Sequence, residues 1–412
     1  MSERLPDWAE DDRLARAAWS RLAEPEDHVA GWARHLLGPV RAMQHVLSGD
    51  PLPLAVAEGR VEDAGRARRR LDRALERWRV RLDTLAPERD VWVVERLGGR
   101  LLVPGDDEWP QGLADLEARA PACLWLWGPA HLARAVERSV AVVGSRASTA
   151  YGERVAADLA AGVVSHGFTV VSGGAFGIDA AAHRGALAAG GTTVAVLACG
   201  VDRSYPKAHE RLFARVRETG LVVTEAAPGS TVMRTRFLER NRLIAAMTKG
   251  TVVVEAARRS GAISTAGHAA ALGRPLGAVP GPVTSPASTG CHLLLRDLDA
   301  RCVTDAEEVV ELVSPLGERY APEPVLPAYD HDALEGADLR VYESLPVQAF
   351  RPVGSLSQVA GLPVAQVQGA LGRLSLLGLA TSALRPDGER TWRRAARGGP
   401  PSRGYGRHSV TR

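Results

Sequence analysis

The strongest restriction on the fold of this chain is a series of six short apolar runs that alternate with amphipathic segments between residues 139 and 313. Each run is rich in apolar residues, and a Gly, Ser or Pro follows it closely. The runs are Ser139–Val143, Phe168–Ser172, Thr193–Leu197, Leu221–Thr224, Thr251–Glu255 and Leu276–Val279. This alternation predicts an α/β fold with a doubly wound parallel sheet. Because such sheets bind ligands beyond the carboxyl ends of their strands, the polar motifs that follow the runs form the candidate site.

The composition predicts a soluble globular protein with more than one domain. Of the 412 residues, 45% are hydrophobic and 24% are charged, which is enough for buried cores and a solvated surface. No signal peptide is recognisable, and no apolar stretch reaches the roughly 20 residues that span a bilayer. We therefore expect a cytoplasmic protein with no membrane partner. The four cysteines lack close paired spacing, which predicts free thiols and neither a zinc site nor a disulfide framework. We expect no cofactor and no metal.

Changes in composition divide the chain into five expected segments. Eight of the nine Trp residues lie before residue 128, which predicts a change of domain near that point. Helical periodicity covers residues 13–47 and 61–85, and three helical segments with a hairpin signal at Asp387-Gly388 predict a small winged helix. The segments are an N-terminal helical domain (1–100), a Rossmann-like domain (101–313, with 101–138 as its lead-in), a linker (314–332), a winged-helix domain (333–396) and a disordered basic tail (397–412).

Arginine dominates the basic residues, since all but two of the 51 are arginines. Four of them gather at Arg66, Arg68, Arg69 and Arg70 in the N-terminal segment. A cluster of this kind can contact a phosphate backbone. Acidic residues flank it, so a solvated helix face is the favoured interpretation, and the sequence alone assigns it no function.

Gly144-Ser145-Arg146 joins the first predicted strand to a helix that the apolar spacing predicts over Tyr151–His166. Gly144 permits a tight turn, after which the N–H groups that open the helix face the end of the strand. A phosphate fits there, with the Arg146 guanidinium as its planar partner. The motif therefore predicts an anion site at this edge of the sheet.

A glycine-rich loop follows the second strand and opens another helix. The backbone at Gly173 and Gly174 can approach a phosphate closely. Asp179 stands where a carboxylate favours the helix dipole, so a structural cap is preferred to a catalytic role. His183 follows on the same helix face, but no third ligand for a metal is evident.

The loop after the third strand brings together Tyr205, Pro206 and Lys207. Tyr205 can stack on a base, and the Lys207 ammonium can meet a phosphate oxygen. In an equally supported interpretation, Tyr205 and Pro206 pack at the start of a helix while Lys207 is solvated.

The segment after the fourth strand carries the densest group of cations in the sheet domain. Between Pro228 and Lys249 its only acid is Glu239. Arginines interleaved with planar side chains suit a groove for a single-stranded backbone. The residues concerned are Arg234, Arg236, Phe237, Arg240, Asn241 and Arg242. A further helix start at Ser260–Thr265, which includes Ser264, offers N–H groups to another anion.

In their order and spacing these motifs resemble the DNA-processing protein A family, also called DprA or Smf. The motifs are GSR at Gly144, SGGAFGID at Ser172, CGVDRSYPK at Cys199, TEAAPG at Thr224, RFLERNRLIA at Arg236, VVVEAARRSGAIST at Val252 and GRPLGAVPG at Gly273. The resemblance implies an extended Rossmann-like domain that binds single-stranded DNA, forms a homodimer and helps to load the RecA recombinase during natural transformation. It implies no catalysis.

The resemblance also implies roles for individual residues. Gly144, Ser145 and Arg146 would form a central phosphate pocket, and Lys207 would add a second charged contact. The groove beside the pocket would contain Arg240, Asn241 and Arg242. With the glycine loop and the other helix starts, the expected DNA-binding set also includes Gly173, Gly174, Arg236 and Ser264. The expected dimer-forming edge contains Ile263, Cys291, His292 and Leu293.

A nucleotide-binding or nucleotide-hydrolysing enzyme of a related Rossmann-like family is the alternative. Asp179, His183 and Glu255 would then be its acid and base candidates. The glycine loop with a nearby Glu that marks such hydrolases is absent from the sequence, and no coherent nucleophile or metal set is visible. We therefore expect a DNA-binding protein without enzymatic activity. In the predicted winged helix, Arg373 is the only basic residue of Val364–Leu376, which favours protein contact over duplex recognition.

Overall fold

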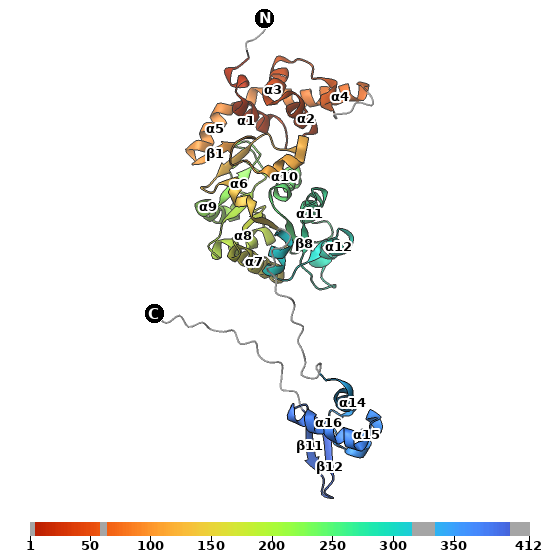
Figure 1. Cartoon of the computed structure of the whole chain (residues 1–412). Helices are drawn as coiled ribbons and strands as arrows, with labels where there is room; N and C mark the ends of the chain where they lie inside the picture. The colour runs from red at the N-terminus through yellow and green to blue at the C-terminus, as the bar shows by residue number, and fades with distance from the viewer. Residues whose placement is uncertain (1–4, 58–63, 315–333, 396–412) are drawn as a thin grey trace, which may run out of the picture. The chain divides into compact units, whose positions relative to one another are not determined.

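The computed structural model describes residues 5–57, 64–314 and 334–395, and the chain divides into two compact units (Figure 1). The first unit comprises Met1–Ala321 and the second Pro322–Arg412. The predicted basic tail and, apart from Ser314, the predicted linker lie outside the described residues. Within the described part of the chain, no helix has the length and apolar character needed to cross a membrane.

A nine-stranded sheet in the order β1-β2-β6-β5-β4-β3-β7-β8-β9 forms the centre of the first unit. Strands β3 to β9 are mutually parallel, whereas β2 is antiparallel to β6 and β1 is antiparallel to β2. The strands are β1 (Gly99–Leu102), β2 (Leu124–Trp127), β3 (Ser139–Val143), β4 (Thr169–Ser172), β5 (Thr193–Val196), β6 (Leu221–Thr224), β7 (Thr251–Val253), β8 (Leu276–Ala278) and β9 (Arg301–Cys302). The six predicted strands are confirmed as β3 to β8, and the large parallel sheet confirms the predicted α/β class.

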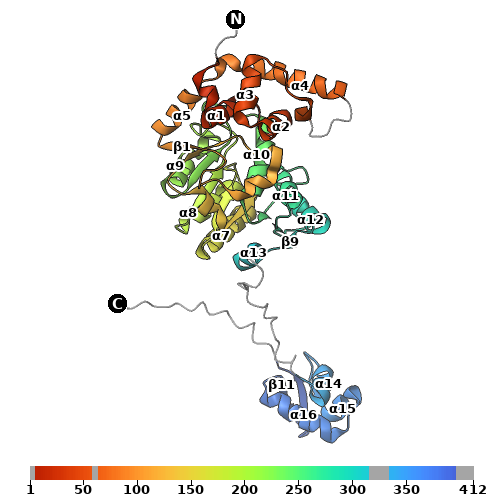
Figure 2. The same ribbon diagram turned by 45° about the horizontal axis from the view of Figure 1, so that its top comes forward.

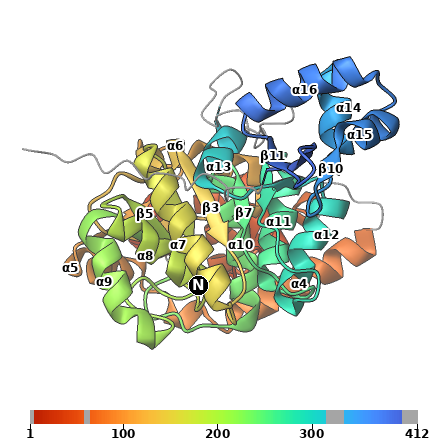
Figure 3. The same cartoon turned by 90° about the horizontal axis from the view of Figure 1, so that it is seen from below.

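Strands β3 to β8 are buried on both faces because their side chains alternate between two hydrophobic cores. In β3, Val140 and Val142 belong to the core under α7, α8 and α13, whereas Ala141 and Val143 belong to the core under α10, α11 and α12. Figure 3 shows these helices around the strands. The helices are α7 (Ala150–Ser165), α8 (Ile178–Ala188), α9 (Glu210–Thr219), α10 (Arg234–Met247), α11 (Gly261–Ala271), α12 (Thr289–Asp297) and α13 (Ala306–Val313).

The N-terminal helices form a core of their own and also pack against the β1–β2 end of the sheet (Figure 2). They are α1 (Asp12–Leu22), α2 (His28–Leu37), α3 (Pro39–Ser48), α4 (Ala64–Arg79) and α5 (Pro87–Arg96), with α6 (Leu132–Glu137) following the second strand. In their core the rings of Trp19 and Trp78 meet edge to face, with centroids 5.2 Å apart. Trp125 of β2 is fully buried and donates its indole N–H to the Ser20 hydroxyl at 3.2 Å. Helices and sheet are therefore continuous in packing.

The described part of the second unit, residues 334–395, contains three helices and a three-stranded antiparallel sheet in the order β10-β12-β11. Its elements are α14 (Gly336–Ser344), β10 (Arg351–Pro352), α15 (Val353–Ala360), α16 (Val364–Leu376), β11 (Ala380–Leu384) and β12 (Arg390–Arg394). The predicted hairpin is present, and Gly388 in its turn has a φ of 84°, which favours glycine. The Arg373 guanidinium of α16 forms an ion pair with Asp338 at 2.6 Å. The winged-helix identity of this unit remains a prediction.

Candidate nucleic-acid interface

A cavity of about 530 Å³ lies at the carboxyl end of β3, beside β7. The chain fills one side of the sheet from β3 through β4 and β5 to β6, and then crosses to β7, β8 and β9 on the other side. The order of the strands therefore reverses between β3 and β7, where open parallel sheets bind their ligands. The polar side chains that line the cavity are Ser145, Arg146, Asp179, Arg234, Arg240, Asn241, Arg259, Ser260 and Thr265.

Gly144 and Arg146 shape the loop after β3. A side chain at position 144 would meet the Ile178 side chain at 2.5 Å and the Glu255 carbonyl oxygen at 2.8 Å, so only glycine fits. The Ser145 N–H donates to that same carbonyl at 2.7 Å, and the Ser145 hydroxyl accepts from the Ala147 N–H at 3.2 Å. These two amides already have hydrogen-bond acceptors in the protein, which differs from the expected row of free N–H donors. What the loop presents outward is the exposed Arg146 side chain.

The start of α7 holds an internal anion where the sequence predicted a phosphate. The Glu255 carboxylate accepts from the Thr149 N–H at 2.9 Å and from the Thr149 hydroxyl at 2.6 Å. Thr149 in turn caps α7 by accepting from the Gly152 N–H at 3.2 Å. A negative charge at a helix start is favourable. Glu255 is thus a structural cap, and this contradicts its role as an acid or base in the alternative enzyme.

The glycine loop after β4 is approached closely by an arginine of the protein itself. A side chain on Gly173 would meet the Arg240 guanidinium at 2.5 Å, and Gly174 has a φ of 67° with the Phe213 ring beside it. Arg240 donates to the Gly173 carbonyl at 2.7 Å and also to the Val196 carbonyl. Burial lowers the pKa of Arg240 to about 10. The two glycines therefore make room for Arg240, whose side chain is 4% exposed.

Asp179 and His183 on α8 are both buried, and neither forms part of an acid–base pair with Glu255. Asp179 lies in the first turn of α8, where a carboxylate favours the helix dipole, but the N-cap is Gly177, and the carboxylate accepts from the Ala175 N–H of the preceding loop at 3.3 Å. Burial raises the pKa of Asp179. The His183 Nδ1 lies 2.7 Å from the Thr193 hydroxyl, which itself donates to a backbone carbonyl, so this nitrogen donates. Burial lowers the pKa of His183 to about 3. A neutral, fully buried imidazole serves packing rather than proton transfer.

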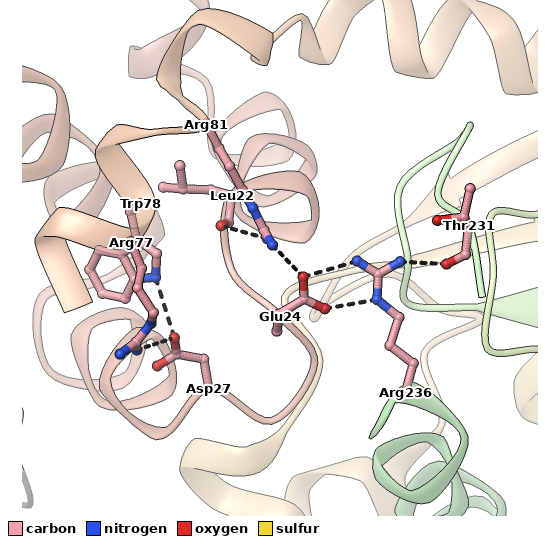
Figure 4. Close-up of polar contacts among 8 residues, drawn as sticks. All are labelled: Leu22, Glu24, Asp27, Arg77, Trp78, Arg81, Thr231 and Arg236. Atoms are coloured by element: carbon pink, nitrogen blue, oxygen red, sulfur yellow. Dashed lines mark hydrogen bonds and ion pairs between the residues drawn. The ribbon is translucent and has the colours of Figure 1, made fainter. Parts of the chain in front are cut away.

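Arg236 at the start of α10 is turned towards the N-terminal helices (Figure 4). Its Nε and one terminal nitrogen donate to the Glu24 carboxylate at 2.7 and 3.0 Å, and the other donates to the Thr231 carbonyl at 2.8 Å. Glu24 also accepts from Arg81 of the loop after α4. Burial raises the pKa of Glu24, but its hydrogen bonds to Arg236 and Arg81 outweigh burial and lower it overall. Glu24 therefore ties α10 to the N-terminal helices.

Arg242 forms a buried two-point ion pair with Glu225, which follows β6. The two guanidinium nitrogens donate to the two carboxylate oxygens at 2.6 and 2.7 Å, and the residues are 1% and 9% exposed. Next to this pair, Asn241 donates to the Gly261 carbonyl at 3.2 Å and lines the cavity. The structure thus places Arg236 and Arg242 against internal acids and leaves Arg240 and Asn241 as the buried floor of the cavity.

Three exposed arginines remain at the cavity: Arg146, Arg234 and Arg259. Within residues 5–57, 64–314 and 334–395, none of the three has a carboxylate within ion-pair distance. Arg259 was not among the predicted site residues. The signal that could have identified it is its position directly before Ser260, which caps α11 by accepting from the Ala262 N–H at 3.3 Å. On α11, Thr265 rather than the predicted Ser264 lines the cavity. The cavity therefore has a cationic rim.

Exposed and half-buried aromatic rings extend the surface beyond this rim. The Arg146 guanidinium carbon lies 4.4 Å from the centre of the Phe237 ring, and the Phe237 and Tyr205 ring centres are 5.7 Å apart. Tyr205 is 44% exposed, and Lys207 in the following turn is exposed as well. Phe176 from the glycine loop is 48% exposed and completes the aromatic surface. Arg146 and the rings of Phe176, Tyr205 and Phe237 thus line one pocket, and Lys207 follows Tyr205 in the chain. We call this set the stacking rim and define it by Arg146, Phe237, Tyr205, Lys207 and Phe176.

The four residues of the expected dimer edge lie on α11 and α12 but differ in accessibility. Ile263 and Leu293 are half-buried. His292 bonds through Nε2 to the Gly281 carbonyl at 3.0 Å. The Cys291 side chain is fully buried in the core of its own chain, and burial raises the pKa of its thiol to about 11. Cys291 therefore supports α12 from within and presents no side chain to another copy.

Glu239 carries the most unusual carboxylate near the site. Burial and the neighbouring charges of Glu225 and Glu24 raise its pKa to about 7, and Oε2 has no hydrogen-bond partner among the described residues. The folded state therefore keeps this proton at pH values where the unfolded chain loses it, so the contribution to stability is complete below about pH 4.5 and disappears as the pH rises through about 7. We expect Glu239→Gln to remove this loss.

The measurement is the urea midpoint of the wild type and the variant between about pH 5 and pH 8. The expected result is a flatter pH dependence for Glu239→Gln and a relative gain in its stability towards pH 8. Glu210→Gln, at an exposed acid on α9, serves as the control and should follow the wild type. Parallel curves for the wild type and Glu239→Gln would contradict the prediction.

Comparison with known proteins gives consistent similarities. A family model described as DNA recombination-mediator protein A matches residues 100–314. A Mycobacterium tuberculosis protein named DNA processing protein DprA is 45% identical over 382 residues, which cover 90% of this chain and 92% of the relative. The Escherichia coli protein Smf is 37% identical and covers 67% of this chain and 74% of the relative. The X-ray structure of DNA processing protein A from Streptococcus pneumoniae superposes with a TM-score of 0.56 at 28% identity, covering 76% of this chain and 99% of that one.

Proposed function

The chain belongs to the DNA recombination-mediator protein A family, whose members are DNA-binding recombination mediators and not enzymes, and we propose that it binds single-stranded DNA at the cavity between β3 and β7. In this proposal the cationic rim holds phosphates and the stacking rim holds bases. We further propose that the protein helps to load the RecA recombinase onto the bound strand in the cytoplasm during transformation or DNA processing. The family resemblance supports that step.

The observation that carries the proposal is the Arg146 guanidinium stacked on Phe237 at an exposed edge, with no acid paired to it among the described residues. A guanidinium in this position can donate two hydrogen bonds to a phosphate while its face stays on the ring. Tyr205 and Phe176 continue the surface with exposed rings, on which unpaired bases stack. A duplex buries those base faces, so the arrangement favours a single strand.

We divide the residues expected at the DNA site into two tiers, of which only the outer one is proposed to contact DNA. Gly144, Ser145, Arg146 and Lys207 form the outer tier, in which Arg146 and Lys207 supply exposed charge. The inner tier supports the loops that carry the outer one, and its members are Gly173, Gly174, Arg236, Arg240, Asn241, Arg242 and Ser264. In this division Arg240 positions the glycine loop through the Gly173 carbonyl, and the inner arginines act through the fold rather than by touching phosphate.

A homodimer and a winged helix are further parts of the proposal. Ile263 and Leu293 are the half-buried apolar side chains of α11 and α12 that can meet a second copy. The three helices and hairpin of the second unit support a winged helix, and the ion pair of Arg373 with Asp338 favours a protein contact for α16. The expected five-segment division of the chain likewise stays a proposal.

The experiment that tests the proposal measures binding of fluorescent single- and double-stranded oligonucleotides across a salt series. We expect tighter binding to the single strand and a linear fall of log affinity with log salt, with a slope of about −0.7 for each phosphate neutralised. Equal affinity for both forms would argue against the stacking rim. Absence of binding at low salt would end the proposal.

A further inference from the structure

Helix α4 in the N-terminal part of the first unit carries seven arginines and only two acids, Asp72 and Glu76. Its buried face is apolar and packs into the N-terminal core, so its charges are confined to the remaining surface. The buried residues are Ala67, Leu71, Ala74, Leu75 and Trp78. Helix α4 lies at the periphery of the unit in Figures 1 and 2. Its arginines therefore face outward from the domain.

Five of the arginines share one face, because they follow one another at intervals of three, four or one residues. We call this set the α4 arginine face and define it as Arg66, Arg69, Arg70, Arg73 and Arg77. All of them except the half-buried Arg70 are exposed. Along the helix, residues four apart rise by about 6 Å, so the face presents regularly spaced guanidinium groups.

The acids near α4 do not neutralise the centre of this face. Asp72 forms an ion pair at 3.1 Å with Arg68, and Arg68 is not part of the α4 arginine face. Asp27 forms an ion pair with Arg77, which is the last residue of that face. Arg73 donates its Nε to the Arg69 carbonyl at 3.2 Å. Among the described residues, neither Arg69 nor Arg73 has a carboxylate within ion-pair distance.

This arrangement is unfavourable for the helix on its own. Arg69, Arg73 and Arg77 are spaced four residues apart, where like charges repel. A purely structural helix gains nothing from this repulsion, whereas a row of anions along the helix relieves it.

We propose that the α4 arginine face binds the phosphate backbone of single-stranded DNA that extends beyond the cavity. A nucleic-acid backbone is a regular row of anions, and the forked guanidinium group matches the phosphate geometry. The cavity and α4 belong to the same compact unit, so one long strand can meet both. The inference rests on the proposed function and extends it from the sheet domain to the N-terminal helices.

The test uses the full chain with the Arg69→Ala/Arg73→Ala double variant and two fluorescent single strands of about 12 and about 60 nucleotides, the shorter matching the site of one small binding fold. We expect a loss of roughly fivefold to tenfold in affinity for the long strand at low salt, and a salt slope that is shallower by about 1.4. Affinity for the short strand should not change. Arg69→Lys/Arg73→Lys keeps the charge and should retain most of the slope.

A second pair, Arg89→Ala/Arg154→Ala, removes the same charge from exposed positions on α5 and α7 and should behave as the wild type. The inference is overturned if the α4 variant binds the long strand normally, if it loses affinity for both lengths alike, or if the control pair loses as much.

Arg146→Ala separates the two proposals, because it should weaken the binding of both strand lengths. If Arg146→Ala weakens binding and the α4 variant does not, the cavity proposal stands and the α4 proposal fails. Unchanged unfolding midpoints confirm that the variants fold, and Arg69→Gln/Arg73→Gln replaces the alanine pair if they do not.

Discussion

Replacing Arg146 by alanine is expected to lower the affinity for single-stranded DNA by roughly 10- to 100-fold. A hydrogen bond to a charged group contributes about 1.5–3 kcal/mol, and each 1.4 kcal/mol changes an equilibrium constant tenfold. The guanidinium is exposed, so its loss leaves no buried charge behind. It also lies on Phe237 at 4.4 Å, and the variant removes one layer of the stacking rim. Fluorescence anisotropy at fixed salt measures the change.

Two further variants separate charge from geometry at this position. Arg146→Lys keeps the charge but loses the fork and the flat face, so it should recover the salt slope more fully than the affinity. Arg154→Ala removes an exposed arginine of α7 that pairs with Asp158 at 3.6 Å, and it should bind DNA normally. Wild-type affinity in Arg146→Ala would show that the phosphate contact lies elsewhere.

The second large effect is expected from Arg242→Met, which should destabilise the first unit by roughly 3–5 kcal/mol, the range for breaking a buried ion pair. The substitution leaves the Glu225 carboxylate 9% exposed and without its two donors. The urea midpoint followed by tryptophan fluorescence reports on this unit, because eight of the nine Trp residues lie in it. DNA affinity measured well below the midpoint should fall less than in Arg146→Ala.

Removing both charges tests the cause of the loss. Because replacing both members of a buried pair by apolar residues is often neutral, Glu225→Leu/Arg242→Met should be more stable than Arg242→Met alone. The exposed pair at Arg154 gives the matched control, since its removal should cost at most about 1 kcal/mol. Simple addition of the two single-variant losses in the double variant would contradict a coupled pair.

Strands β3 to β8 could be predicted from the sequence because they are buried on both faces. A strand such as Ser139–Val143 then appears as a continuous apolar run, and helical periodicity follows it directly. Strands β1 and β2 could not be recognised in the same way. Strand β1 begins with Gly99 and Arg100 and is no continuous apolar run, and β2 pairs with β6, nearly a hundred positions away in the chain. Long-range antiparallel pairing leaves no local signal in such short runs.

The polar motifs were predicted to meet at one edge of the sheet, and several of them do line one cavity there, but the state of their charges was not predicted. Counting acids near Arg236 and Arg242 in sequence finds only Glu239, whereas their actual partners are Glu24 and Glu225. Glu24 is 212 positions from Arg236, and no local pattern reports such a contact. The same limit applies at α7, where Glu255 occupies the helix start that the sequence left to a phosphate. Local spacing predicts which groups gather at an edge, but tertiary contacts decide which of them stay unpaired.

The hydrogen bonds and ion pairs between the N-terminal helices and the sheet domain have a practical consequence for work with fragments of this protein. Excising residues 100–314, the stretch shared across the family, would strip Ser20 from Trp125, Glu24 from Arg236 and the Arg21 side chain from the Pro228 carbonyl. The buried side of the sheet domain would then be exposed to water, with the Trp125 indole and the Arg236 guanidinium left without these partners. Such a fragment would be prone to aggregate, and its behaviour would say little about the intact molecule.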